Sequence, residues 1–317
     1  MDEKRIISLK EGDFIDSCYA VKWVQLFHKK NGEPYLRLVL TDKTGEIPAI
    51  CWNFKKEYEE IKVDSICSIK GNVNLYNEKL QVVISSIEIV DDEEVDFSLF
   101  VKTSDKSIET LAQEIEEIIS NVEADYFKKL ISAFFDDSAF KRKFLTHPAA
   151  KSVHHSWVGG LAEHTIGVCR ICSFLAGLYE LNSDLLITSA LLHDIGKIKE
   201  LKNGITANYT DEGRLIGHII LGVNMIDERI SAITDFPANA LNELKHSILS
   251  HHGELEFGSP IRPMTIEALA LHYADNTDSK ISAFKDWIEQ KPDMSDPKWT
   301  QFWPMMDRFI YRNSDSD

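Results

Sequence analysis

Apolar and polar residues alternate with a period of two through most of residues 14–90. The segment Tyr35-Leu36-Arg37-Leu38-Val39-Leu40 shows this pattern best; it stops at turn residues 42–45 and resumes at 47–52. Alternation of this kind predicts strands that bury one face. The later elements expected are a short helix at 54–61 and strands at 65–73 and 79–90, the last two joined by a turn at Asn77-Glu78. The pattern therefore predicts a small five-stranded β-barrel.

The periodicity becomes helical after residue 107. Two apolar stripes show helical spacing: Leu111, Ile115, Ile118 and Ile119, then Phe127, Leu130, Ile131 and Phe134. The whole of 151–312 is expected to be helices joined by short loops. The acidic run 91–96 separates the two patterns.

Five strands with one helix between the third and fourth are the plan of an oligonucleotide-binding (OB) fold. We therefore expect a multidomain β + all-α protein. Its expected parts are an OB-fold barrel at 1–90, an acidic linker at 91–104, a helical connecting region at 105–149 and an all-helical domain at 150–312.

The chain has 317 residues and a net charge of −16. This charge argues against a nucleic-acid partner, because phosphate binding usually needs a basic surface. Residues 1–90, however, hold 13 Lys and Arg against 14 Asp and Glu. A nearly neutral first domain can carry a local basic face, and an acidic second domain can accept phosphates if bound cations supply positive charge.

The cysteines and the N-terminus indicate the compartment. Five cysteines, an odd and scattered number, give no disulfide framework. The first residues have no apolar core of the kind that a secretory signal needs, and no apolar run reaches bilayer length. We expect a cytoplasmic protein with no membrane partner, and a homo-oligomer is left open.

Histidines and aspartates recur at the ends of apolar helices. The strongest signal is Leu191-Leu192-His193-Asp194-Ile195-Gly196-Lys197, which follows the apolar helix 185–192. The same pattern includes one residue before this segment, His164, and several after it: His218, His251-His252 and Asp275. Polar groups without partners are costly in such places. Imidazoles and carboxylates converging from several helices suit Mn²⁺, Fe²⁺, Co²⁺ or Zn²⁺ better than Mg²⁺ or Ca²⁺.

At these residues the chain resembles the HD superfamily of metal phosphohydrolases. The order His…His-Asp…Asp is that superfamily's signature, and His218 and His251 resemble its two-metal members. The resemblance implies that His164, His193, Asp194 and Asp275 hold one metal ion. It implies that Asp194, His218 and His251 hold a second, with Asp194 bridging. His252 is either a further ligand or a residue that orients its neighbour.

A narrower resemblance covers nearly the whole chain. The OB-like barrel, the stretch 154–165 (HHSWVGGLAEHT) and the HD core together resemble the YhaM-type 3′-5′ exoribonucleases. The resemblance implies two divalent ions, Mn²⁺ foremost with Co²⁺ or Fe²⁺ as alternatives. It implies single-stranded RNA as the substrate, single-stranded DNA to a lesser extent, and nucleoside 5′-monophosphates as products.

Two further residues are candidates for catalysis. Lys197 follows Asp194 by three residues, so on a helix the two share a face; it could stabilise charge on the phosphate, or be a solvated lysine at a helix end. His155, with His154, could contact substrate or protonate the leaving group, or belong to a polar loop that enters the next helix.

The barrel offers a candidate surface for a single strand. If Leu36, Leu38 and Leu40 fill the core, Tyr35 and Arg37 point outward, where such barrels stack bases on aromatic rings beside cations. Residues that could join them, or else pack in the barrel, are Lys22, Trp23, Phe27 and Trp52.

Other features are expected to be structural. Cys169 and Cys172 have no second pair to complete a zinc site, and Gly159-Gly160 lacks the residues of a phosphate loop. Arg262 is expected on a surface loop, and His246 and His272 in structural roles.

Two other functions stay open. An HD phosphodiesterase could act on a small nucleotide or cyclic dinucleotide, although such a substrate needs no separate barrel. A nucleic-acid-binding, replication-associated factor could carry an HD domain that is only structural, although the ligand set is intact.

Overall fold

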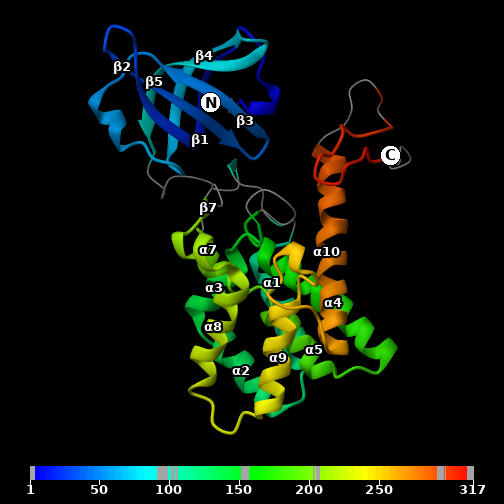
Figure 1. Ribbon diagram of the computed structural model, residues 1–317. Coiled ribbons are helices and arrows are strands. Elements are labelled where there is room, and N and C mark those ends of the chain that lie inside the picture. The colour runs from blue at the N-terminus through cyan, green and yellow to red at the C-terminus, as the bar shows by residue number, and fades with distance from the viewer. Residues whose placement is uncertain are drawn as a thin grey trace. The chain divides into compact units, whose positions relative to one another are not determined.

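The computed structural model describes residues 4–90, 99–100, 104, 106–150, 157–202, 204, 208–290, 296 and 298–312. The chain divides into two compact units (Figure 1). One unit comprises residues 1–103 with 204–206, and the other comprises 104–203 and 207–317.

The first unit is a closed barrel of five strands in the order β1-β2-β3-β5-β4. All neighbouring pairs are antiparallel except β3 and β5. The strands are β1 (Phe14–His28), β2 (Pro34–Asp42), β3 (Gly45–Cys51), β4 (Ile66–Tyr76) and β5 (Lys79–Ile89). The predicted OB-type barrel is confirmed.

Strand β1 pairs with two neighbours because it is long and irregular. Its first half pairs with β4 and its second half with β2, with a break in register between Val21 and Trp23. An irregularity of this kind bends a strand and increases its twist, which helps a sheet to close. Leu36, Leu38 and Leu40 of β2 are buried, as the alternation predicts.

Two local predictions in the barrel have different outcomes. The turn at Asn77-Glu78 is confirmed, and both residues have positive φ, as the tightest hairpin turns require. The expected helix at 54–61 is only a 3₁₀ helix, η2 (Lys56–Glu60). Its one turn is held to the barrel by the buried Tyr58.

The second unit is built on helices (Figure 1). The first five are α1 (Ile108–Ser120), α2 (Asp125–Phe135), α3 (Ser138–Thr146), α4 (Gly160–Tyr179) and α5 (Ser183–Leu192). The later ones are α6 (Lys197–Glu200), α7 (Asp211–Ile216), α8 (His218–Ile230), α9 (Ala238–Ser250), the 3₁₀ helix η5 (Leu255–Phe257) and α10 (Ile266–Gln290). One hydrophobic core joins α1–α3 to the helices that follow them.

The expectation of helices throughout 151–312 is wrong in two places. Strands β6 (Leu201–Lys202) and β7 (Asn208–Tyr209) pair as a small antiparallel sheet. After α10, residues 298–312 contain no helix and pack on the helix end through Trp303, whose ring stacks on Trp287 at 5.1 Å.

By length and composition, helix α4 is long and apolar enough to cross a membrane. The expectation that no apolar run reaches bilayer length is therefore wrong for this helix. Half of that helix's apolar window is buried among the other helices, as in the core helix of a folded domain. Cys169 and Cys172 are free thiols that are buried on this helix.

Candidate metal centre

Helix ends bring the predicted ligands together. His193 lies at the C-terminal end of α5 and is followed by Asp194 in the turn before α6. His164 comes from α4, and Asp275 from α10. His218 begins α8, and His251 ends α9. The apolar faces of these helices pack into one core, which fixes Asp275 within α10 and the other ligands near helix ends.

Three residues form a first cluster. The Nε2 atoms of His164 and His193 lie 3.3 Å apart, and His164 Nε2 lies 3.2 Å from Asp275 Oδ1. The ligand atoms of His164, His193 and Asp275 all lie within 4.8 Å of one another. This spacing suits three ligands of one ion.

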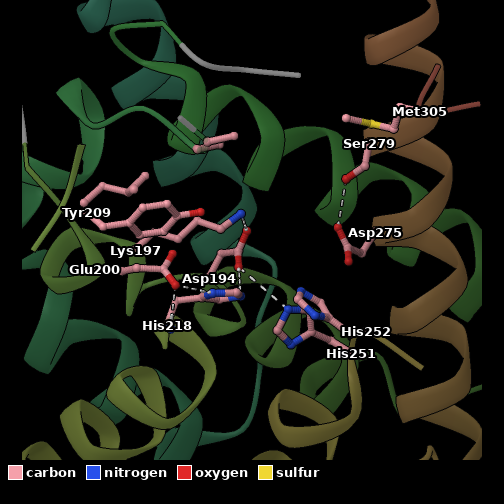
Figure 2. Close-up of a pocket in the computed structure, with 13 residues that line it drawn as sticks. Asp194, Lys197, Glu200, Tyr209, His218, His251, His252, Asp275, Ser279 and Met305 are labelled. Atoms are coloured by element: carbon pink, nitrogen blue, oxygen red, sulfur yellow. Dashed lines mark hydrogen bonds and ion pairs between the residues drawn. The ribbon is translucent and has the colours of Figure 1, made fainter. Parts of the chain in front are cut away.

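A second cluster consists of His218, His251 and His252, whose ligand atoms also lie within 4.8 Å of one another. Asp194 stands between the two clusters. Its Oδ2 lies 3.5 Å from His164 Nε2 and 3.3 Å from His193 Nε2. Its Oδ1 lies 3.5 Å from His218 Nε2 and 3.7 Å from His251 Nε2. Each oxygen of this one carboxylate therefore faces a different cluster. Figure 2 shows Asp194 with His218 and His251 of the second cluster.

All five histidines turn the same nitrogen into the site, because each Nδ1 has an acceptor elsewhere. The carboxylates of Asp278 and Glu200 accept from His164 at 2.7 Å and His218 at 3.1 Å. Backbone carbonyls accept from the other three: Ala190 from His193, Ile248 from His251 and Phe257 from His252. A histidine that donates from Nδ1 keeps its Nε2 lone pair for a metal, and such partners are typical of metal sites.

Two of the inward atoms lack hydrogen-bond partners within the described part of the chain. Asp194 Oδ1 and His218 Nε2 are buried and make no hydrogen bond within the described part of the chain. The facing Nε2 atoms of His164 and His193 need a proton or a cation between them, since two lone pairs at 3.3 Å repel. The residues present therefore fit two divalent ions, one in each cluster, with Asp194 shared.

The pKa values of histidines shift in opposite directions in the two clusters. Burial disfavours the charged form of His164, but Asp275 and Asp278 outweigh it and raise its pKa to about 9. In the second cluster, burial lowers the pKa of His251 and of His252, so both are neutral near pH 7. Burial alone would raise the pKa of Asp194, but Lys197 and His193 hold it well below its usual value.

Lys197 and Glu200 complete one side of the site. Lys197 Nζ lies 2.6 Å from Asp194 Oδ2, and this contact outweighs burial and raises the lysine's pKa. Glu200 accepts from both the backbone N–H and the ring of His218, at 3.0 and 3.1 Å. The carboxylate thus holds the first residue of α8 in place while leaving His218 Nε2 directed inward.

Two glycines allow these close approaches. A side chain at Gly196, between Asp194 and Lys197, would overlap the backbone carbonyl of His218, so only glycine lets α8 begin so close to α6. A side chain at Gly167 on α4 would overlap the Asp278 carboxylate that orients His164. These glycines are therefore part of how the ligands are positioned.

On the barrel, four aromatic rings form a continuous row, which we call the aromatic row. Ring centroids are 6.4 Å apart from Trp23 to Phe27, 5.8 Å from Phe27 to Tyr35 and 4.8 Å from Tyr35 to Trp52. Arg37 lies 5.5 Å from the Phe27 ring, and Lys29 lies 5.8 Å from that of Trp52. Trp23 and Trp52 are exposed, so the row lies on the surface and not in the barrel core.

Comparisons with known proteins agree with this two-part plan. Residues 161–280 match the HD domain family model, and residues 21–90 match the OB-fold nucleic acid binding domain model. The chain is 34% identical over 290 residues to the 3′-5′ exoribonuclease YhaM of Geobacillus sp. (strain WCH70), which covers 90% of this chain and 89% of that protein. The chain belongs to the YhaM family.

Two solved structures resemble part of this YhaM-family chain. The second OB-fold domain of replication protein A from Methanococcus maripaludis is 22% identical, with 30% of this chain and 99% of that one covered and a TM-score of 0.24. The asparaginyl-tRNA synthetase of Entamoeba histolytica is 12% identical, with 45% and 36% covered and a TM-score of 0.25. At these scores the likeness carries no weight for function.

The structure of this YhaM-family chain brings together all seven residues proposed as metal ligands. The sequence left open whether His252 is a ligand; the structure places it in the second cluster. His155 and its neighbour His154 lie outside the described residues. On the barrel, Trp23, Tyr35 and Trp52 belong to the aromatic row and Arg37 lies against it. Lys22 pairs with Glu46.

The residues set aside behave as expected where the structure describes them. Arg262 pairs with Glu254 at 2.7 Å, His246 accepts from the backbone N–H of Met264, and His272 donates to the backbone carbonyl of His251.

Asp278 and Glu200 were missed by the sequence analysis. Each follows a recognised residue by three positions, Asp275 and Lys197 respectively, and that spacing on a helix was the available signal.

Proposed function

We propose that this chain is a metal-dependent 3′-5′ exoribonuclease. It hydrolyses phosphodiester bonds of single-stranded RNA, and less readily of single-stranded DNA, and releases nucleoside 5′-monophosphates. The observation that carries the proposal is the Asp194 carboxylate, which presents one oxygen to each of two histidine clusters whose Nε2 atoms all face inward. Membership of the YhaM family supports the reaction and its polarity.

His164, His193, Asp194 and Asp275 would hold one ion, and Asp194, His218, His251 and His252 the other. When bound, two such ions would supply a water nucleophile and positive charge for the phosphate oxygens. The protein's own residues position these groups: Asp278 and Glu200 fix the rings of His164 and His218. Lys197 supplies a buried positive charge beside Asp194, where it would stabilise negative charge that develops on the phosphate.

The barrel would hold the strand that the helical domain cuts. Its aromatic row offers stacking surfaces to successive bases, and Arg37 and Lys29 offer charges to the backbone. A separate strand-binding domain suits a long substrate better than a free nucleotide. The cytoplasmic location remains a prediction from the sequence.

The test uses purified, full-length protein, Mn²⁺ and single-stranded RNA or DNA labelled at either the 5′ or the 3′ end. The expected result is a ladder of shortening products from 5′-labelled RNA, immediate release of a mononucleotide from 3′-labelled RNA, and slower cleavage of DNA. Internal cuts, or release of the 5′ label as a mononucleotide, would contradict the proposed polarity. Binding without any cleavage would favour a structural HD domain.

Metal preference tests the nitrogen-rich ligand set. After the protein is stripped with a chelator, Mn²⁺ or Co²⁺ should restore faster hydrolysis than Mg²⁺, because Mg²⁺ prefers oxygen ligands. Initial rates with each ion at equal concentration provide the measurement. Full activity with Mg²⁺ alone would count against ligation by five histidines.

A further inference from the structure

The metal centre opens into a cavity of about 390 Å³. That volume lies in the range of about 300–1,000 Å³ typical of small-molecule sites. The cavity has two chemically different parts. One part is charged and contains Lys197 and Glu200 with five of the proposed metal ligands: Asp194, His218, His251, His252 and Asp275. The apolar and aromatic residues of the lining, which we call the apolar part, are Ala149, Ala150, Leu201, Tyr209 and Met305.

The apolar part has no role in holding metal or in stabilising charge. Tyr209 enters the cavity on the side of Lys197 and Glu200, and Met305 lies across it, near Asp275 (Figure 2). Tyr209 is 39% exposed, and no aromatic ring packs against it within the described part of the chain. Its ring is thus available to a ligand that occupies the cavity.

We propose that Tyr209 is a stacking wall for the base of the terminal nucleotide, and thus a specificity-determining residue of this site. The inference rests on the proposed function for the identity of the ligand. A nucleotide has the same division as the cavity, since its phosphate is charged and its base is apolar on both faces. With the phosphate at the metal centre, the nucleoside must lie in the adjoining apolar part, where Tyr209 presents a ring.

This arrangement also bears on how much of the strand is removed at each step. A cavity of nucleotide size beside the metal centre accommodates one residue of the chain, and the rest of the strand must leave through its mouth. Stacking on a ring does not read the hydrogen-bonding edge of a base, so contact with Tyr209 should accept every base. The structure therefore assigns to Tyr209 a preference for nucleosides over other phosphate esters, without discrimination among the bases.

The test measures binding and does not depend on hydrolysis. Calorimetry would compare adenosine 5′-monophosphate with ribose 5-phosphate, which has no base, on the full-length Mn²⁺-loaded protein. The parent should bind the nucleotide more tightly. Tyr209→Ala should weaken nucleotide binding about tenfold, as loss of one stacking contact implies, and leave ribose 5-phosphate binding unchanged. Tyr209→Phe should match the parent because it keeps the ring.

Tyr179→Ala is the matched control, since it removes an exposed tyrosine from the far end of α4. It should leave both ligands unaffected. Equal affinity of the parent for both ligands would overturn the proposal, as would equal weakening of both by Tyr209→Ala. If that variant has a lower melting temperature, Tyr209→Leu keeps apolar bulk and should still lose part of the preference for the nucleotide. A failure of the exonuclease proposal would appear separately, as the absence of shortened RNA.

Discussion

Asp194 shows how a single residue can link two metal sites. Replacing it with Asn preserves its shape but removes the charge and one of the two oxygens that face the clusters. Asp194→Asn should lower turnover at least about a thousandfold, because the two-metal arrangement contributes several kcal/mol. Initial rates on end-labelled RNA, with circular dichroism to check the fold, provide the measurement. Asp125→Asn, at an exposed position in α2, is the control, and near-parental turnover of Asp194→Asn would refute the bridging role.

The two carboxylates that accept hydrogen bonds from histidine Nδ1 atoms should each affect metal binding at one site. Asp278 contacts His164 of the first cluster, and Glu200 contacts His218 of the second. Loss of such a partner typically lowers metal affinity about 10–100-fold. We expect Asp278→Asn to weaken one class of Mn²⁺ sites and Glu200→Gln to weaken the other. Titration of each variant with Mn²⁺ would show this, and identical effects on both classes from either variant would contradict the division.

The sequence could predict which residues cluster at the candidate metal centre, but not the carboxylates that hold their rings. His193-Asp194 and the other ligands could be recognised because their residue types, order and helical context form a pattern. Asp278 and Glu200 are ordinary acidic residues on helices, and acidic residues are common on solvated helix faces. Their role depends on how α10 crosses α4 and how α6 meets α8, which no local pattern encodes.

At the scale of elements, the crossing of α4 and α10 depends on Gly167. A methyl group there would displace the Asp278 carboxylate and with it the ring of His164. Gly167→Ala should therefore weaken first-site Mn²⁺ binding about tenfold or more, as the loss of a supporting carboxylate does. Metal titration and thermal unfolding would measure the two effects.

Gly177→Ala provides the control for this prediction on the same helix. A methyl group at Gly177 meets nothing within 4 Å, so the change should leave metal binding intact. Its stability should rise by up to about 1 kcal/mol, because alanine is the better helix former. If both variants bind metal equally, the packing at Gly167 does not position His164.

Elements were predictable where a local pattern decides the structure. Alternation on β2 and the stripes on α1 and α2 correctly gave the buried faces. Residues 298–312 were wrongly expected to be helical, although Pro304 disfavours a helix there. That segment is held by tertiary contacts, chiefly the stack of Trp303 on Trp287, and such contacts between distant residues leave no periodic signal.

At the scale of the whole molecule, the net charge of −16 is compatible with a nucleic-acid substrate because the proposed strand-binding surface and the proposed metal centre lie in different units. The barrel is nearly neutral and carries Arg37 and Lys29 against its aromatic row. The acidic helical unit has clustered metal ligands, so bound cations would provide the positive charge that phosphates need. Substitutions in the barrel should therefore have effects on activity that differ from those of substitutions at the metal centre.

The last prediction distinguishes binding of a long strand from cleavage of the phosphodiester bond. Tyr35 lies between Phe27 and Trp52 in the aromatic row, and Arg37 lies against Phe27. Replacing both Tyr35 and Arg37 with Ala removes a stacking surface worth roughly 1–3 kcal/mol and one cation. The apparent affinity for long single strands should fall at least about tenfold, since 1.4 kcal/mol corresponds to that factor. Cleavage of a dinucleotide or an aryl phosphodiester should change little, because such a substrate need not reach the barrel.

The matched control replaces Phe14 and Lys62, an exposed ring and an exposed cation elsewhere on the barrel, with Ala. It should leave long and short substrates unaffected. The measurement is kcat and KM for both substrates in each double variant. Equal losses on long and minimal substrates in the Tyr35 and Arg37 variant would mean that the barrel supports the catalytic unit structurally. No loss on either would make Tyr35 and Arg37 ordinary surface residues. Strand capture would then have to be sought at Trp23 and Trp52, the two ends of the same row.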